Sequence, residues 1–157
     1  MRARRTTAGG FTLAELVVVV LIIAILAAIT FPKIINQSTE AQIAASSYLV
    51  ENVRTKIEEY WAINGGWPTT VDPAWFQSRR VINPFEPDHP NPLYLDNDPN
   101  KYNLQTKYLA PNCSIWYNRA NGSFAIRVPR QRTDAETLAL YNLVNKASCP
   151  SLSYTGQ

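Results

Sequence analysis

The sequence predicts an α+β protein in which one long N-terminal α-helix, first transmembrane and then amphipathic, packs on a small antiparallel β-sheet head. Three observations carry this prediction: an apolar run over residues 11–31, a helical spacing of apolar residues over 33–63, and a hairpin pattern around Asn121-Gly122. Helix and strands follow one another instead of alternating, which is typical of the α+β class. With 157 residues, the chain has room for one compact domain and an appendage.

The composition indicates a folded chain whose excess charge lies at one end. Hydrophobic residues make up 46% and charged residues 17%, so the chain can bury a core and is not of the disordered class. Arg2, Arg4 and Arg5 account for the whole formal net charge of +3. The rest of the chain therefore has no basic excess that would indicate an acidic partner.

The apolar run over residues 11–31 is long enough to cross a membrane. A helix of this length rises about 31 Å, close to the hydrocarbon thickness of a bilayer. Only Thr12, Glu15 and Thr30 are polar within it, and the arginines precede it. The positive-inside rule then keeps the N-terminus in the cytoplasm and places everything after Pro32 outside. We therefore expect a single-pass protein of the cytoplasmic (inner) membrane with an extracytoplasmic head.

Two ordinary explanations fit this segment less well. A cleaved secretory signal has an apolar region of about 7 to 15 residues. This run is longer, contains Glu15, and is not followed by an A-x-A cleavage site before Pro32. A simple uncleaved anchor gives no reason for Gly9-Gly10 to stand before Phe11.

Residues Gly10-Phe11-Thr12-Leu13-Ala14-Glu15, with the aliphatic run that follows, resemble the class III signal of type IV pilins and type II secretion pseudopilins. The resemblance implies that a prepilin peptidase cuts after Gly10 and methylates the new terminal amine of Phe11. Residues 1–10 would then be a cleaved leader peptide. It also implies the pilin-like lollipop fold, and Pro32 falls where many members carry a helix-interrupting proline.

Glu15 is the acidic residue of this motif, and we expect it to serve assembly. It lies one turn into the mature helix, where a carboxylate complements the helix dipole. A carboxylate in lipid also requires a cationic partner. The resemblance implies that this partner is the Phe11 amine of a neighbouring subunit, which would set the axial register. The alternative is a glutamate that serves only its own helix.

An amphipathic continuation of the helix is expected over residues 32–63. Pro32 has no N–H to donate, so it should bend or loosen the helix where lipid gives way to water. Gly65-Gly66, followed by Pro68, should end the helix. The extracytoplasmic globular head then covers residues 64–157.

The head begins with a proline-rich connector over residues 64–112. The density of proline excludes a long helix or a central strand there. We expect the aromatic residues between the prolines to pack the connector onto the head, with a carbohydrate or partner surface as the alternative. These aromatics include Trp67, Trp75, Phe76, Phe85 and Tyr94.

The clearest strands lie over residues 114–117 and 123–128, on either side of a turn with Asn-Gly chemistry. A short helix is expected over 133–146, beginning at a capping box on Thr133. Any further strand is expected from 102–110 or from the C-terminal tail.

The two cysteines, Cys113 and Cys149, both lie beyond the span on its oxidising side. We expect a disulfide between them, enclosing the last hairpin and helix in a loop of about 36 residues. Such a bond resembles the C-terminal bridged region of many type IV pilins, whereas secretion pseudopilins often lack one.

Metal sites and catalytic sites find little support in the residues. Asp96, Asp98 and Asn100 alternate as calcium ligands do, but Lys101 and Lys107 occupy positions where an EF-hand loop needs glycine and glutamate. They remain a weak calcium candidate, and no cofactor is expected.

His89 is the only histidine, and nothing near it in sequence supplies an activated nucleophile or a zinc ligand set. We therefore assign no catalytic residue and expect no enzyme. Several arginines could form a basic patch, but a solvated or subunit-contact role is favoured over nucleic-acid binding; they are Arg79, Arg80, Arg127, Arg130 and Arg132.

These observations predict a structural subunit of a type IV filament, either a type II secretion pseudopilus or a type IV pilus, in the periplasm or at the cell surface. The resemblance implies three partners: prepilin peptidase, a filament assembly platform, and other pilin-like subunits. Two alternatives remain, a monomeric membrane-anchored binding protein and a DNA-uptake (competence) pilin. Cleavage before Phe11 separates the filament subunit from the monomeric binding protein.

Overall fold

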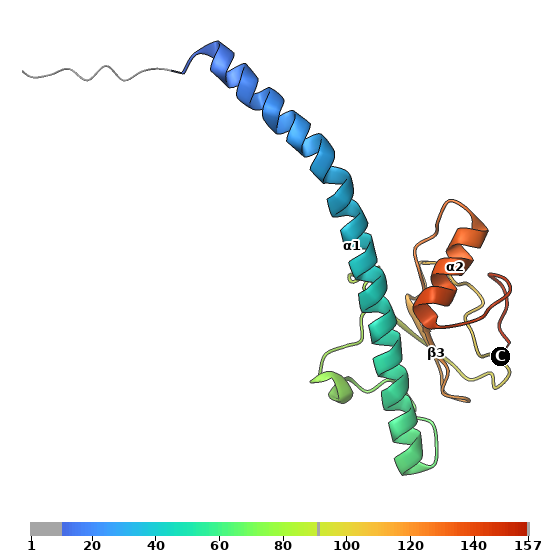
Figure 1. The fold of residues 1–157 in the computed structure, drawn as a ribbon. Helices are drawn as coiled ribbons and strands as arrows, with labels where there is room; N and C mark the ends of the chain where they lie inside the picture. The colour runs from blue at the N-terminus through green and yellow to red at the C-terminus, as the bar shows by residue number, and fades with distance from the viewer. Residues whose placement is uncertain (1–10, 91, 157) are drawn as a thin grey trace, which may run out of the picture. The chain divides into compact units, whose positions relative to one another are not determined.

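The computed structural model describes residues 11–90 and 92–156, and the side chains of these residues except 29–37. The chain divides into two compact units, Met1–Glu40 and Ala41–Gln157. The elements, in chain order, are α1 (Leu13–Asn64), a 3-10 helix (Pro73–Phe76), β1 (Leu93–Asp96), β2 (Ile115–Asn118), β3 (Phe124–Ile126) and α2 (Asp134–Asn145) (Figure 1). The predicted α+β class is confirmed.

Helix α1 is 52 residues long and belongs to both units. Its backbone is helical through Pro32, whose side chain lies outside the described ones. The helix ends at the predicted glycines, because Gly65 adopts φ +69° and its N–H donates to the carbonyl of Trp61 at 2.8 Å. Glycine takes this left-handed conformation without the steric penalty of a Cβ atom.

The sheet has three strands in the order β1-β2-β3. β2 and β3 pair antiparallel, with Tyr117 opposite Phe124, and Gly122 in the turn has φ +73°. This confirms the predicted hairpin. β1 pairs parallel with β2, so the sheet is mixed and not antiparallel throughout. The third strand comes from the proline-rich segment, which corrects the expectation of a strand from 102–110 or the tail.

Proline is compatible with β1 because this strand lies at the edge of the sheet. Pro92 stands directly before it, and the Pro92 carbonyl accepts hydrogen bonds from the N–H groups of Ser114 and Ile115. An edge strand needs ladder hydrogen bonds on one side only, so a missing N–H at its start is tolerated. The segment 64–112 therefore contains one short edge strand, which the expected exclusion of a central strand allows.

One hydrophobic core holds the second unit together. Residues after Glu40 on α1 pack with the sheet and with α2, as Figure 1 shows for the labelled β3 and α2. The buried members of this core are at most 4% exposed and come from all these elements and from the loops, among them Val50, Val53, Ile57, Ile115, Trp116, Tyr117, Phe124, Ile126, Tyr141 and Val144.

Two side chains cover the free edge of β3. The Asn145 amide accepts from the N–H of Ile126 at 2.8 Å and donates to the Ile126 carbonyl at 3.0 Å. The Arg54 guanidinium, from α1, donates to the carbonyls of Phe124 and Asn145. These bonds satisfy backbone groups that an uncovered edge strand would leave open to another chain.

Candidate assembly site

Helix α1 begins with a capping box formed by Thr12 and Glu15. The Thr12 N–H and hydroxyl both donate to Glu15 Oε2 at 2.9 Å, and the Glu15 N–H donates to Thr12 Oγ1 at 3.2 Å. The pattern T-x-x-E is the sequence signature of this motif. The same signature at Thr133 and Glu136 predicted the start of α2, which the structure confirms, whereas the capping box at Thr12 was not predicted.

The described assembly residues lie together at the start of α1. Phe11 is 81% exposed and directly precedes Thr12. Glu15 faces the first turn of its own helix through the bonds above. Gly10 lies outside the described residues, and so does the side chain of Pro32.

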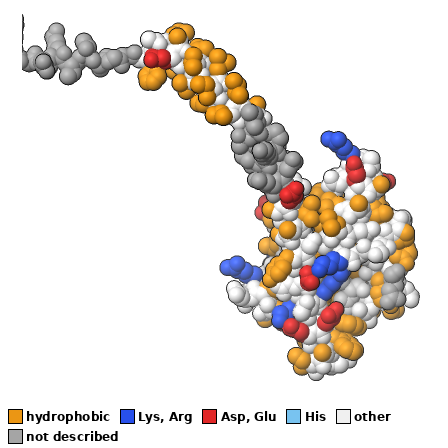
Figure 2. Space-filling model, in the orientation of Figure 1, with side chains coloured by type: hydrophobic (Ala, Val, Ile, Leu, Met, Phe, Trp, Pro, Cys, Tyr) orange, Lys and Arg blue, Asp and Glu red, His pale blue; other side chains and the backbone are white. Residues whose placement is uncertain are grey.

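The N-terminal part of α1 presents apolar side chains to its surroundings. From Leu13 to Leu26, every leucine, isoleucine and valine is between 46% and 81% exposed, and Figure 2 shows these side chains gathered along the helix. A helix that is apolar on all sides is normally covered by a membrane or by other helices. This segment therefore has an apolar surface that nothing in its own unit covers among the described residues.

Among the described residues, no helix reaches the length and apolarity expected of a membrane span. Residues 29–31 of the expected span belong to the part whose side chains are not described.

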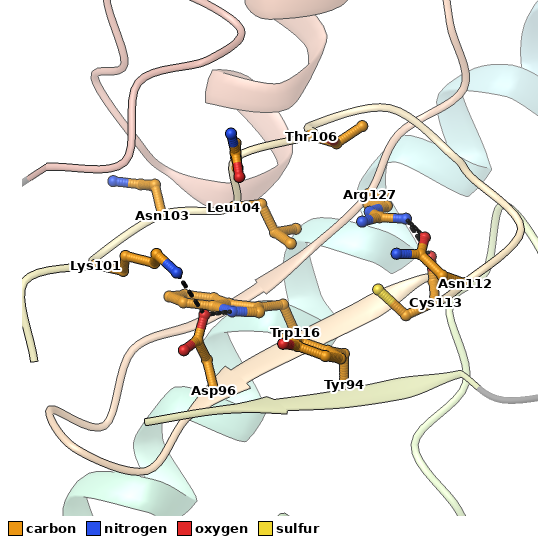
Figure 3. Close-up of a pocket in the computed structure, with 11 residues that line it drawn as sticks. Tyr94, Asp96, Lys101, Asn103, Leu104, Thr106, Asn112, Cys113, Trp116 and Arg127 are labelled. Atoms are coloured by element: carbon orange, nitrogen blue, oxygen red, sulfur yellow. Dashed lines mark hydrogen bonds and ion pairs between the residues drawn. The ribbon is translucent and has the colours of Figure 1, made fainter. Parts of the chain in front are cut away.

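The carboxylates of the calcium candidate in the head already have partners within their own chain. Asp96 Oδ1 accepts from the N–H groups of Asn97 and Asp98, while Oδ2 accepts from Trp116 Nε1 at 3.2 Å. Lys101 Nζ lies 3.6 Å from carboxylate oxygens of both Asp96 and Asp98, and Figure 3 shows its contact with Asp96. The loop thus supplies its own cation.

The pKa of Asp96 and the positions of possible metal ligands are consistent with this internally paired loop. Partial burial raises the pKa of Asp96, but hydrogen bonds from Asp98 and Trp116 together with Lys101 outweigh it and leave the pKa below its usual value. Within the described residues, no three His, Cys, Asp or Glu side chains lie close enough to hold a metal ion.

The two cysteines, both described, are buried free thiols, so the expected disulfide is not confirmed. Their surroundings differ, because Arg127 Nη1 donates to the Cys113 carbonyl at 2.8 Å whereas Lys107 is the cation beside Cys149. Burial raises the pKa of both thiols, and the neighbouring cation opposes the rise in each case. Sequence separation predicted a favourable loop length, but a disulfide also needs the two Cβ atoms close and correctly directed.

Two basic side chains of the head are buried, which sequence analysis did not anticipate. Arg127 is 5% exposed, so it does not belong to a surface basic patch. Lys107 is fully buried, and its ammonium donates to the carbonyls of Leu104, Leu152 and Tyr154. Burial lowers the pKa of Lys107. No local sequence pattern marks either residue as buried, because, apart from Leu104, their partners come from distant segments.

A long helix with an uncovered apolar start and a capped acidic residue, followed by a small α+β head, is the architecture of a pilin-like protein. Residues 5–31 match the family described as the prokaryotic N-terminal methylation motif. Both the motif and the exposed apolar surface thus lie at the same end of the chain.

Relatives extend the match beyond this motif. The type IV major pilin protein PilE1 of Neisseria gonorrhoeae is 28% identical over 146 residues, which cover 85% of this chain and 84% of that protein. The fimbrial protein EcpB of Eikenella corrodens is 36% identical over 115 residues, covering 73% of this chain and 67% of that protein. No solved structure gives a significant match. The chain belongs to the type IV pilin family.

Proposed function

We propose that this protein is a structural subunit of a type IV pilus, and not an enzyme. The uncovered apolar surface of α1 from Leu13 to Leu26 carries this proposal, because subunit helices packed against one another would bury it. The relatives named above are a major pilin and a fimbrial protein, which favours a pilus over a type II secretion pseudopilus.

Processing would prepare the chain for assembly. Prepilin peptidase would remove residues 1–10 after Gly10 and methylate the amine of Phe11. Residues 11–31 would first anchor the subunit in the inner membrane and later form the filament core, while 32–63 continue the helix into the head. The head would lie outside the membrane throughout.

Glu15 would change partners during assembly. In the free subunit its carboxylate accepts two hydrogen bonds from Thr12. In the filament it would also meet the cationic amine of a neighbour's Phe11, and charge-assisted hydrogen bonds are roughly twice as strong as neutral ones. The capping box therefore holds the carboxylate in a satisfied state until that cation arrives.

The first test is mass spectrometry of the protein from its native cell. The expected mass is that of a chain beginning at N-methylated Phe11. An intact chain that retains Met1, found in assembled filaments, would contradict the processing step.

The second test compares two conservative variants. Glu15→Gln should insert normally but form few or no filaments, measured by electron microscopy and by the amount of sheared surface protein. Glu40→Gln, at the next acidic residue of α1, is the matched control and should assemble normally. Equal filament yields in both variants would refute the role of Glu15.

The kind of filament can be tested separately. Antibody against the head should label long surface fibres, and deletion of the gene should remove those fibres while leaving protein secretion intact. Loss of secretion with no change in fibres would indicate a pseudopilus instead. A DNA-uptake role has weaker support, since the buried Arg127 does not contribute to a basic surface.

A further inference from the structure

The head contains an open pocket of about 180 Å³ beside the parallel strand pair β1 and β2. Tyr94 on β1 and Trp116 on β2 are direct partners in the register, so they lie on the same face of the sheet. Figure 3 shows both beneath the segment that carries Lys101, Leu104 and Thr106. We propose that this pocket binds a neutral sugar, as one pyranose ring of a glycan.

The charged side chains in the wall of the pocket are held by an ion pair or by hydrogen bonds within the chain. Asp96 and Lys101 hold each other, as described above. Arg127 Nη1 donates to Asn112 Oδ1 at 2.7 Å and to the Cys113 carbonyl at 2.8 Å (Figure 3). Arg127 has no ion pair among the described residues, and its buried Nε has no hydrogen-bond partner there, so the wall carries one cationic donor. A sugar hydroxyl can accept from such a donor, as an anion also can, and the competition with phosphate described below separates the two.

The polar groups that remain are neutral. Gln105, Thr106 and the hydroxyl of Tyr94 line the pocket and make no side-chain hydrogen bond to other described residues. The Asn112 amide uses its oxygen for Arg127, and within the described residues its Nδ2 has no acceptor. Amides and hydroxyls each serve as donor or acceptor, so several of them around one small pocket match the alternating hydroxyl groups of a sugar.

Tyr94 supplies the apolar contact that a sugar ring needs. Its side chain is 50% exposed although it stands next to the buried Trp116. An exposed aromatic ring at the mouth of a polar pocket can pack on the apolar C–H face of a pyranose while its hydroxyl stays hydrated. The pocket is smaller than the roughly 300–1,000 Å³ of sites for drug-sized ligands, which restricts the ligand to about one ring.

A neighbouring depression indicates the direction of a longer glycan. Gln105 and Thr106 also line a wider and more open depression of about 340 Å³. There the Arg130 guanidinium lies 4.9 Å from the centre of the Tyr108 ring. A second sugar ring attached past Gln105 and Thr106 would reach this surface, so a disaccharide should bind more tightly than its monosaccharide.

The test uses the full chain in detergent micelles, titrated with glucose, galactose, N-acetylglucosamine and their β1,4-linked disaccharides. Saturation-transfer difference NMR should detect at least one of them, with a dissociation constant in the millimolar range. Tyr94→Ala should weaken that binding at least tenfold, and Gln105→Ala by about threefold. Tyr48→Ala, at a tyrosine of α1 that is 71% exposed and does not line the pocket, is the matched control and should bind normally.

Three results would overturn the proposal. One is the absence of a signal from all of these sugars up to 50 millimolar, a limit on the order of ten times the expected constant. Another is unchanged binding in both Tyr94→Ala and Gln105→Ala. The third is displacement of the bound sugar by inorganic phosphate, which would indicate an anion site. Circular dichroism of each variant shows whether the head is still folded. If Tyr94→Ala does not fold, Gln105→Ala still tests the proposal.

Discussion

The N-terminal part of α1 exposes its large apolar side chains, whereas the head buries those of its core. Between Leu13 and Leu26 the large apolar side chains are 46% to 81% exposed, whereas the core members of the head are at most 4% exposed. Both regions use the same residue types, so composition alone does not distinguish them. The head is stabilised by its own contacts, while the N-terminal segment depends on lipid or on other subunits to cover it.

Both regions, however, use side chains to bond backbone polar groups. At the start of α1, the N–H groups of Thr12 and Glu15 each donate to the other residue's side chain. The edge of β3 in the head is satisfied through Arg54 and Asn145. Because these two N–H groups are already bonded, the start of α1 leaves mainly apolar side chains for a partner, which suits a lipid or helical environment.

The sharpest test of this contrast is the same substitution in both regions. Ile57→Ala removes a core side chain that is 1% exposed and should lower the free energy of unfolding of the head by about 2–5 kcal/mol. Ile22→Ala removes a side chain that is 53% exposed and should leave the stability of the head unchanged. Denaturant unfolding in micelles, followed by tryptophan fluorescence, measures both. Similar losses in the two variants would show that the regions are not energetically separate.

A smaller effect is expected where the head covers its own sheet edge. Asn145→Ala leaves the buried Ile126 N–H and carbonyl without partners and should cost about 1–3 kcal/mol in unfolding free energy. The matched control is Asn100→Ala, at an exposed asparagine whose side chain makes no hydrogen bond to other described residues. Chemical denaturation compares the two variants. A loss in Asn145→Ala no larger than in the control would mean that the edge does not need this cover.

The contrast also explains what could be predicted from sequence. The apolar run, the glycines that end α1, the hairpin and the capped α2 all depend on neighbouring residues, and local patterns identified them. β1 was missed because a strand among prolines is allowed only at a sheet edge, and its edge position depends on pairing with β2, about twenty residues further on.

The candidate sites divide in the same way. The Thr12 capping box was open to prediction from its T-x-x-E spacing but was hidden within a motif interpreted for processing and assembly. Burial of Lys107 and Arg127 could not be predicted, since their partners come from segments distant in sequence. The expected disulfide depends in the same way on tertiary packing, which sets the separation and direction of the Cys113 and Cys149 side chains.

The buried thiols give the head a dependence on alkaline pH. Burial raises the pKa of Cys113 above its unfolded value of about 8.5. The thiol therefore stabilises the folded head fully below that pH. The stabilisation declines as pH rises from the unfolded toward the folded pKa, by at most about 1.4 kcal/mol per pH unit. Cys113→Ser should lose less stability between pH 8 and about pH 10 than the parent chain.

Denaturant midpoints across that pH range measure this difference. Lys107 acts in the opposite direction, because its lowered pKa makes the folded head relatively more stable as pH rises toward the unfolded value of about 10.4. The comparison with Cys113→Ser cancels that contribution, since both chains contain Lys107. Parallel pH profiles in the two chains would contradict the titration of Cys113 on unfolding.

The smallest effect is expected at the start of α1. Thr12→Val removes the hydroxyl that donates to Glu15 Oε2 and accepts from the Glu15 N–H, which should destabilise the first turn by about 0.5–2 kcal/mol. Thr12→Ser keeps the hydroxyl and serves as the control. Hydrogen exchange in micelles should show faster exchange for the Glu15 amide in Thr12→Val, with the amides of the head unchanged. Equal protection in both variants would show that lipid or detergent, and not the capping box, holds the first turn. The Glu15 carboxylate would then not be held by Thr12 before a neighbouring subunit arrives.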